Sequence, residues 1–147
     1  MEPIEKSSEY RQFAPFNIEQ TAKSPGISFN PNINMITISG ISVPENHVSF
    51  YNPILAWFEA FVKNPPEKTH VVIRMEYFNT SSSTNLLKIF RTLETIVDEG
   101  KKVELFWIYE EDDWDMKECG TDYKSLVKFP FNLKPVKEGE NSLNIPI

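Results

Sequence analysis

The sequence predicts a single α/β domain whose mixed, mostly parallel central sheet starts with an antiparallel hairpin and carries about three helices. Two observations support this. Apolar residues repeat with a period of two in the first third of the chain, and helical and strand-like periods alternate after it. The later strands are separated by segments long enough to hold a helix, which parallel strands need as a crossover. With 147 residues, 40% of them hydrophobic, the chain supports one packed core.

The first third of the chain predicts a tail followed by short strands. Residues 1–14 are polar and without periodicity, so we interpret them as an N-terminal tail that is weakly ordered unless something docks it. The domain is expected over residues 15–136, with a C-terminal tail at 137–147. Its first elements are a short edge strand at 16–20 and a hairpin whose Asn-rich turn lies at 30–34.

A first helix is predicted by a change to a helical period. The apolar residues that share one wide helix face are Phe50, Ile54, Trp57, Phe58, Phe61 and Val62. Pro53 lies inside this pattern and leaves two alternatives. Either the helix begins at Pro53 with Asn52 as its cap, or an earlier turn from Asn46 is kinked by the proline.

Two further strands and a second helix follow. The strand at 69–78 opens with aliphatic residues, which indicates burial on both faces. The second helix is expected from Thr84 to Glu99, because Gly100 stands in the position favoured after a helix C-terminus. Residues 101–109 predict the next strand.

A third helix and a last strand complete the predicted order. The acidic run at 110–115 complements the positive end of a helix dipole, so the helix is expected to start there and to reach about Val127. Gly120 inside it costs roughly 1 kcal/mol relative to alanine and weakens this prediction. Residues 127–133 are expected to return as a strand.

Composition argues for a protein partner rather than a nucleic acid or a membrane. The chain has 21 acidic against 15 basic residues and a formal net charge of −6, which opposes binding to a phosphate backbone or an anionic membrane surface. One cysteine, Cys119, allows no internal disulfide, and His47 and His70 stand far apart, so no metal or other cofactor is expected. No signal segment or long apolar run is found, so we expect a cytoplasmic protein.

The sequence carries no strong catalytic motif. Glycine-rich phosphate loops and a G-x-S-x-G elbow are absent from it. Cys119 has no neighbour that would make it a thiolate, so we interpret it as a small buried hydrophobe. We therefore expect a protein that is not an enzyme.

Four consecutive hydroxyl residues, Thr80 to Ser83, lie between a predicted strand and a predicted helix. The structural interpretation is that Thr80 or one of the serines caps the helix by accepting from its first amides. Four hydroxyls exceed what one cap needs. A loop after a parallel strand is a common place for a site, and the amides of a helix start would hold an added phosphate.

Three segments together resemble a known family. They are "SVPENHVSFYNPILAWFEAF", "YFNTSSSTNLLKIFRTLE" and "KKVELFWIYEEDDWDMKECGTDYKSLVKFPF", and the likeness covers about residues 16–134. In this order they are similar to the SiaC family of bacterial regulatory phosphoproteins. The resemblance implies a fold similar to the STAS domains of anti-sigma-factor antagonists and a role in partner switching.

The resemblance also implies partners and a phosphorylation site. A dedicated serine/threonine kinase would phosphorylate one hydroxyl, and a PP2C-type phosphatase would remove the phosphate. The unmodified form would bind a target such as a diguanylate cyclase. Such a target would link the protein to c-di-GMP signalling. By position, the phosphorylated residue falls on Thr80, with Ser81 as runner-up. The expected partner-binding residues are Glu45, Asn46, Tyr77, Asn79, Thr80, Ser81 and Ser82.

Several of these residues have a second interpretation. Asn79 orients the acceptor hydroxyl or is an ordinary turn asparagine. Glu45 and Asn46 lie on the binding rim or cap the first helix. Two other functions also stay open: a constitutive protein-binding scaffold, and a metal-dependent hydrolase that uses the carboxylates at 110–115 with Thr80 or Ser81 as nucleophile.

Overall fold

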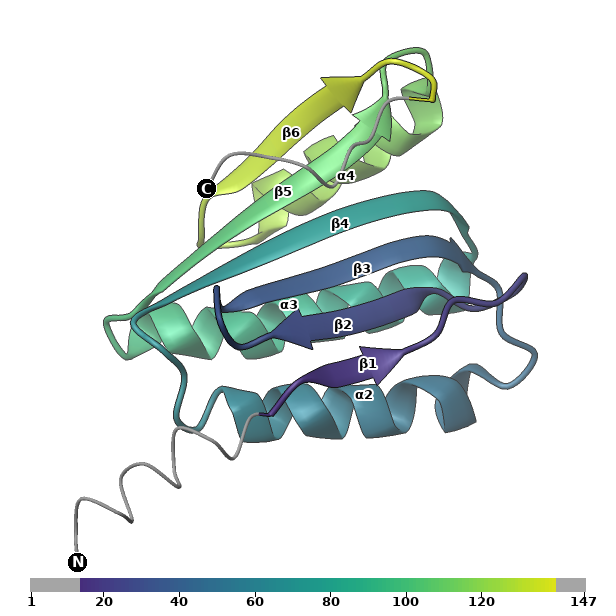
Figure 1. The fold of residues 1–147 in the computed structure, drawn as a ribbon. Helices are drawn as coiled ribbons and strands as arrows, with labels where there is room; N and C mark the ends of the chain where they lie inside the picture. The colour runs from purple at the N-terminus through teal and green to yellow at the C-terminus, as the bar shows by residue number, and fades with distance from the viewer. Residues whose placement is uncertain (1–13, 140–147) are drawn as a thin grey trace, which may run out of the picture.

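The computed structural model describes residues 14–139 as an α/β structure (Figure 1). Most of both predicted tails therefore lies outside the described residues. The elements are, in chain order, β1 (Phe16–Ile18), β2 (Gly26–Asn30), β3 (Met35–Ser42), α2 (His47–Phe61), β4 (Lys68–Phe78), α3 (Thr80–Asp98), β5 (Lys102–Glu110), α4 (Trp114–Leu126) and β6 (Phe131–Val136). None of these helices is long and apolar enough to cross a membrane.

The six strands form one mixed sheet in the order β1-β2-β3-β4-β5-β6. The first three strands pair antiparallel, and β3 to β6 pair parallel. The predicted fold class, a mixed and mostly parallel sheet with an N-terminal antiparallel part and three helices, is confirmed. Each parallel pair is joined through one of the helices.

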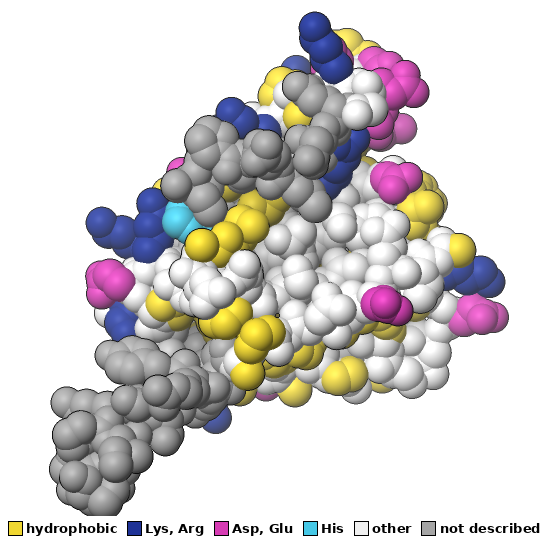
Figure 2. All heavy atoms as spheres, viewed as in Figure 1, with side chains coloured by type: hydrophobic (Ala, Val, Ile, Leu, Met, Phe, Trp, Pro, Cys, Tyr) yellow, Lys and Arg dark blue, Asp and Glu magenta, His cyan; other side chains and the backbone are white. Residues whose placement is uncertain are grey.

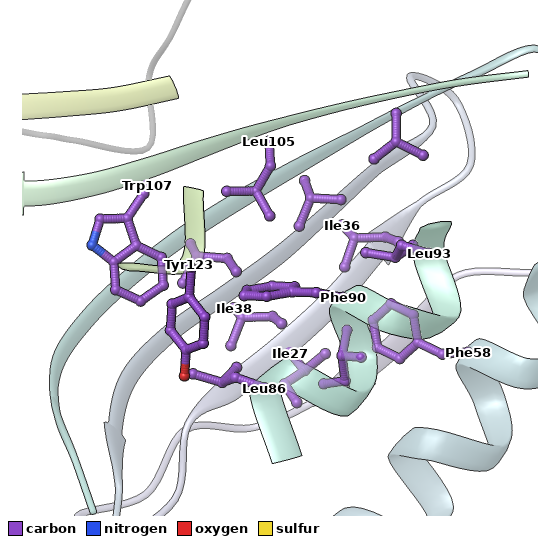
Figure 3. Packing of buried hydrophobic residues seen from close by; sticks show 14 of the residues in the cluster. Ile27, Ile36, Ile38, Phe58, Leu86, Phe90, Leu93, Leu105, Trp107 and Tyr123 are labelled. Carbon is purple, nitrogen blue, oxygen red and sulfur yellow. The ribbon is translucent and has the colours of Figure 1, made fainter. Parts of the chain in front are cut away.

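The three helices within residues 14–139 lie on the same side of this sheet (Figure 1). The strand order explains the arrangement, because every crossover moves one strand further in the same direction and such crossovers are almost always right-handed. The hydrophobic core therefore forms between one face of the sheet and the helices. Figure 3 shows Phe90 of α3 in the middle of this layer, among Ile36, Ile38 and Leu105 of the sheet.

The helix starts decide between the two alternatives for α2 and correct the prediction for α3. Helix α2 begins at His47, because Asn46 caps it by accepting from the Ser49 amide at 3.1 Å, so the earlier of the two predicted starts is right and Pro53 lies inside the helix. Helix α3 begins at Thr80 instead of Thr84, because its cap lies before the hydroxyl run.

The C-terminal elements follow the prediction with shifted bounds. Helix α4 starts within the acidic run, where Asp113 accepts from the Met116 amide at 3.1 Å. The last strand begins at Phe131 rather than at 127, because pairing with β5 starts where Phe131 meets Leu105. Cys119, expected to be buried, is half-buried, and burial together with nearby carboxylates raises the pKa of its thiol, so it stays protonated near neutral pH.

Gly120 of α4 is required by a close approach to the sheet. A Cβ atom at this position would lie 2.4 Å from Cδ1 of Trp107. The indole has no room to move, since it is buried and its Nε1 donates to the Met116 carbonyl at 3.0 Å. The glycine that looked unfavourable for a helix therefore permits α4 to pack on β5.

We predict that Gly120→Ala destabilises the protein although alanine favours helices. The gain of roughly 1 kcal/mol in helix propensity is outweighed by overpacking, and the unfolding free energy should fall by about 1–2 kcal/mol in a denaturant titration. The control is Lys124→Ala on the exposed side of the same helix, which should change it by less than about 0.5 kcal/mol. A stabilised Gly120→Ala variant would contradict the packing argument.

Candidate functional site

The candidate site lies at one edge of the sheet. In a parallel arrangement each helix starts where the preceding strand ends, so α2, α3 and α4 all begin at the carboxyl edge of β3, β4 and β5 (Figure 1, right). The first turns of α2 and α3 are adjacent, because Asn85 Nδ2 lies 3.4 Å from His47 Nδ1. Three positive helix ends and their loops therefore share this edge.

Asn79, rather than Thr80 or a serine, caps α3. Its backbone is extended, and its side-chain oxygen accepts from the Ser82 amide at 3.0 Å and from the Ser81 hydroxyl at 3.1 Å. The residue is fixed at the end of β4 because its amide donates to the Ser42 carbonyl at 3.2 Å. It thus holds the hydroxyl of Ser81, not that of Thr80.

Ser82 anchors the start of α3 inside the protein. Its hydroxyl donates to the Ser42 carbonyl at 2.8 Å and lies 2.7 Å from the Ser42 hydroxyl, which lies 2.6 Å from the Tyr51 hydroxyl. Since Ser82 uses its proton on the carbonyl, Ser42 must donate to Ser82 and Tyr51 must donate to Ser42. Burial raises the pKa of Tyr51, which keeps its proton in place.

This burial corrects one expected partner contact. Ser82 and Ser42 are both 0% exposed. A partner protein therefore has no access to Ser82, and its role in the site is to fix the helix start. The sequence did not show this because its partner, Ser42, is 40 residues away.

Ser83 is held by α4. Its hydroxyl lies 2.9 Å from the Tyr123 hydroxyl, which in turn donates to the Ser83 carbonyl at 2.9 Å. Burial raises the pKa of Tyr123 to about 12, so the phenol remains a donor at neutral pH. This pair ties the start of α3 to the C-terminal part of α4.

Thr80 differs from the three serines. It is exposed at the first position of α3, and among the described residues its hydroxyl makes no hydrogen bond. Ser81, the runner-up, is half-buried and its hydroxyl is held by Asn79. Of the four hydroxyls, that of Thr80 is the one most open to a protein that would modify it.

Exposed apolar side chains lie at the same edge of the sheet. Tyr77 at the end of β4 is 58% exposed, Val48 at the start of α2 is 52% exposed, and Trp114 at the start of α4 is 70% exposed. Tyr77 was expected here from the sequence, whereas Val48 and Trp114 were missed. Trp114 could have been found from the sequence. The buried residues of α4 repeat at helical spacing starting with Met116, and Trp114 does not lie on that buried face.

The acidic run has structural partners. Asp113 caps α4, and Glu110 pairs with Arg74 at 3.2 Å beside a polar cavity of about 230 Å³. Within residues 14–139 no group of three or more His, Cys, Asp and Glu side chains is placed to hold a metal ion. Glu45 and Asn46 are exposed at the start of α2, and Asn46 also serves as its cap.

Comparison with known proteins identifies relatives of this chain. A sequence model described as SiaC family regulatory phosphoprotein matches residues 18–136. An uncharacterised protein of Pseudomonas aeruginosa (strain UCBPP-PA14) is 25% identical over 118 residues, which cover 80% of this chain and 94% of that protein.

Two solved structures share the fold. Apo-SiaC from Pseudomonas aeruginosa superposes with a TM-score of 0.75 at 25% identity, covering 83% of this chain and 99% of that one. A chain from the structure of diguanylate cyclase SiaD in complex with its activator SiaC, also from Pseudomonas aeruginosa, superposes with a TM-score of 0.77 at 25% identity, covering 82% and 99%.

The hydroxyl network predicts different outcomes for neighbouring substitutions. Ser82→Ala leaves the buried Ser42 hydroxyl without its acceptor, and we expect the unfolding free energy to fall by about 1–3 kcal/mol. Thr80→Ala removes an exposed hydroxyl and should change it by less than about 0.5 kcal/mol. Chemical denaturation of both variants measures the difference, and equal effects would contradict the assignment of the two hydroxyls.

Proposed function

Because the chain belongs to the SiaC family of regulatory phosphoproteins, we propose that it is a non-enzymatic binding protein controlled by reversible phosphorylation of Thr80. The unmodified form binds and regulates a target protein, and the phosphate weakens that binding. The observation that supports this most is the exposure of Thr80 beside three hydroxyls that are held by Asn79, Ser42 and Tyr123.

The target in this proposal is inferred from the partner of a relative of this chain. SiaC of Pseudomonas aeruginosa is an activator found in complex with the diguanylate cyclase SiaD, so we take a diguanylate cyclase as the target here. A serine/threonine kinase adds the phosphate and a PP2C-type phosphatase removes it. The exchange takes place in the cytoplasm, where a kinase finds ATP.

A phosphate on Thr80 is compatible with the fold. Thr80 occupies the first position of α3, where the free backbone amides and the helix dipole favour a negative group by about 0.3–1 kcal/mol. The first turn of α3 contains no acidic residue that would repel it. The modified protein should therefore remain folded.

At an interface the same phosphate has a larger effect. Phosphothreonine adds about −1.5 to −2 charges at neutral pH. One like-charge contact at about 4 Å costs on the order of 4 kcal/mol at an effective dielectric constant of 20, and about 1.4 kcal/mol changes affinity tenfold. Even if screening halves the repulsion, binding falls by roughly thirtyfold. The effect on the partner exceeds the effect on the fold.

The surface around Thr80 fits a protein contact. Tyr77 and Trp114 are large, exposed and carry a polar handle, and such residues contribute most of the affinity in many interfaces. Val48 adds an aliphatic contact from the neighbouring helix start. Glu45, Asn46, Asn79 and Ser81 would form the polar rim of this surface.

Phosphopeptide mapping tests the acceptor. After incubation with ATP and the cognate kinase, we expect one phosphate on Thr80 and none on the Thr80→Ala variant. Incorporation at Ser81 in the wild-type protein would move the acceptor by one residue. No incorporation with a kinase shown to be active would favour the constitutive scaffold.

A charge substitution tests the switch itself. Thr80→Glu should keep the melting temperature within a few degrees of wild type and weaken binding to the target cyclase about tenfold in calorimetry, because it carries less charge than a phosphate. The matched control is Thr95→Glu, which puts the same charge on an exposed position near the other end of α3 and should bind like wild type. Equal affinities of wild type and Thr80→Glu would refute the proposal.

A further inference from the structure

A cavity of about 430 Å³ lies at the amino edge of the parallel strands, at the opposite end of the sheet from Thr80. Its wall is formed where β4 and β5 begin, where α3 ends and where the loop after α4 leads into β6. Every residue that lines it lies within residues 14–139. The volume is within the range of about 300–1,000 Å³ that small-molecule sites span.

Positive charge gathers around this cavity. Four lysines line it against one acidic residue, Glu104, although the whole chain has a formal net charge of −6. Figure 2 shows Lys and Arg side chains along the left margin, the end of the molecule at which α3 passes into β5 in Figure 1. A concave wall lined by one sign of charge attracts ligands of the other sign. The four lysines are Lys68, Lys101, Lys102 and Lys128.

Two of these lysines have weak acidic partners. The Lys68 Nζ atom lies 3.3 Å from Glu104, and the Lys128 Nζ atom lies 3.9 Å from Asp98. Both lysine side chains are exposed, and exposed ion pairs add at most about 1 kcal/mol to stability. Both ammonium groups can therefore turn toward an anion in the cavity.

The other two lysines keep donors available. The Nζ atom of Lys101 donates to the Pro65 carbonyl at 2.9 Å, which leaves two of its three hydrogens for a ligand. Among the described residues, the side chain of Lys102 makes neither an ion pair nor a hydrogen bond. All four lysines can thus contribute to one anion site.

The helix ends at this edge do not account for the lysines. Helices α3 and α4 both end beside the cavity, and each helix C-terminus carries roughly half a negative charge. The four lysines therefore face Glu104, Asp98 and about one further unit of negative charge from the two helix ends. The balance at the cavity stays positive.

The cavity also has an apolar part. Ligand sites typically combine apolar walls with a few polar groups, whereas a site for a bare ion needs no apolar wall. Two of the apolar residues, Val103 and Phe129, belong to the hydrophobic core, so this part of the wall is fixed in place. The apolar residues that line the cavity are Val97, Val103, Phe129 and Pro130.

We propose that this cavity binds a small organic phosphate, whose phosphate contacts the lysines and whose apolar body packs against Val97 and Pro130. A phosphate monoester carries about −1.5 to −2 charges at neutral pH and three acceptor oxygens, so several ammonium groups bind it at once. A carboxylate offers one charge and two oxygens. The site is independent of the proposed switch, because Thr80 lies at the other edge of the sheet.

A titration of the full chain with phenyl phosphate tests the site, with backbone amides followed by NMR. We expect saturable shifts at Val97, Lys102 and Phe129. Inorganic phosphate should bind about tenfold more weakly because it has no apolar body, and benzoate should also bind more weakly because it carries one charge.

Three results of this titration would overturn the proposal. The first is the absence of saturable shifts at the cavity. The second is equal affinity for inorganic phosphate and phenyl phosphate, which would show general attraction of anions. The third is tighter binding of a polyglutamate peptide than of phenyl phosphate, which would make the cavity a docking place for an acidic protein segment.

A pair of double variants tests the lysines. Lys102→Gln with Lys128→Gln should weaken phenyl phosphate binding about tenfold or more. The matched control is Lys23→Gln with Lys88→Gln, which removes the same charge at the other edge of the sheet and in the middle of α3. It should change affinity less than about twofold, because charges more than about 10 Å away are screened at about 0.1 M salt.

The stability of both double variants is a further control. All four substituted lysines are exposed, so the melting temperatures should stay within about 2 °C of wild type. A difference in affinity then reports the cavity and not the fold. Equal losses of affinity in the two double variants would overturn the proposal, since net charge alone would explain them.

Discussion

The parallel pairing of β3 to β6 in sequential order is the constraint on which the rest of this structure depends. It places the three helices on one face, their N-terminal ends at one edge and the other face without a described helix. The hydroxyl run stands at that edge because it follows the end of β4 directly. The place of the proposed phosphorylation site is thus a consequence of this topology.

The hydroxyl run is an example of similar residues with different roles. One hydroxyl cannot cap a helix, join a buried chain of hydrogen bonds and contact α4 at the same time. Asn79 therefore caps α3, Ser82 bonds to Ser42 and through it to Tyr51, and Ser83 bonds to Tyr123. These bonds fix the first turn of α3 to three neighbouring elements. A rigid turn holds Thr80 at a constant place on the surface, which a recognition site needs.

The sequence was sufficient for local features and insufficient where a partner is distant. The spacing of apolar residues and the residues that start or end elements predicted the strands, the three helices and the cap region of α4. These features depend on residues a few positions apart. The start of α3 was predicted too late because the hydroxyl run was taken as the cap, whereas Asn79 before it is the cap and its amide also donates to the distant Ser42 carbonyl. Gly120 looked unfavourable because the Trp107 ring that needs it lies on another element.

Thr80 shares its edge of the sheet with exposed apolar side chains, and this has a physical consequence for the proposed switch. A target that packs on Tyr77 and Trp114 removes water from the surface between them. A phosphate there would lose hydration without gaining a cation, and removing a charged group from water is costly even when no like charge faces it. The proposed switch therefore does not depend on an acidic residue in the target. Repulsion and desolvation act in the same direction, so one modified hydroxyl can release a partner held by several contacts.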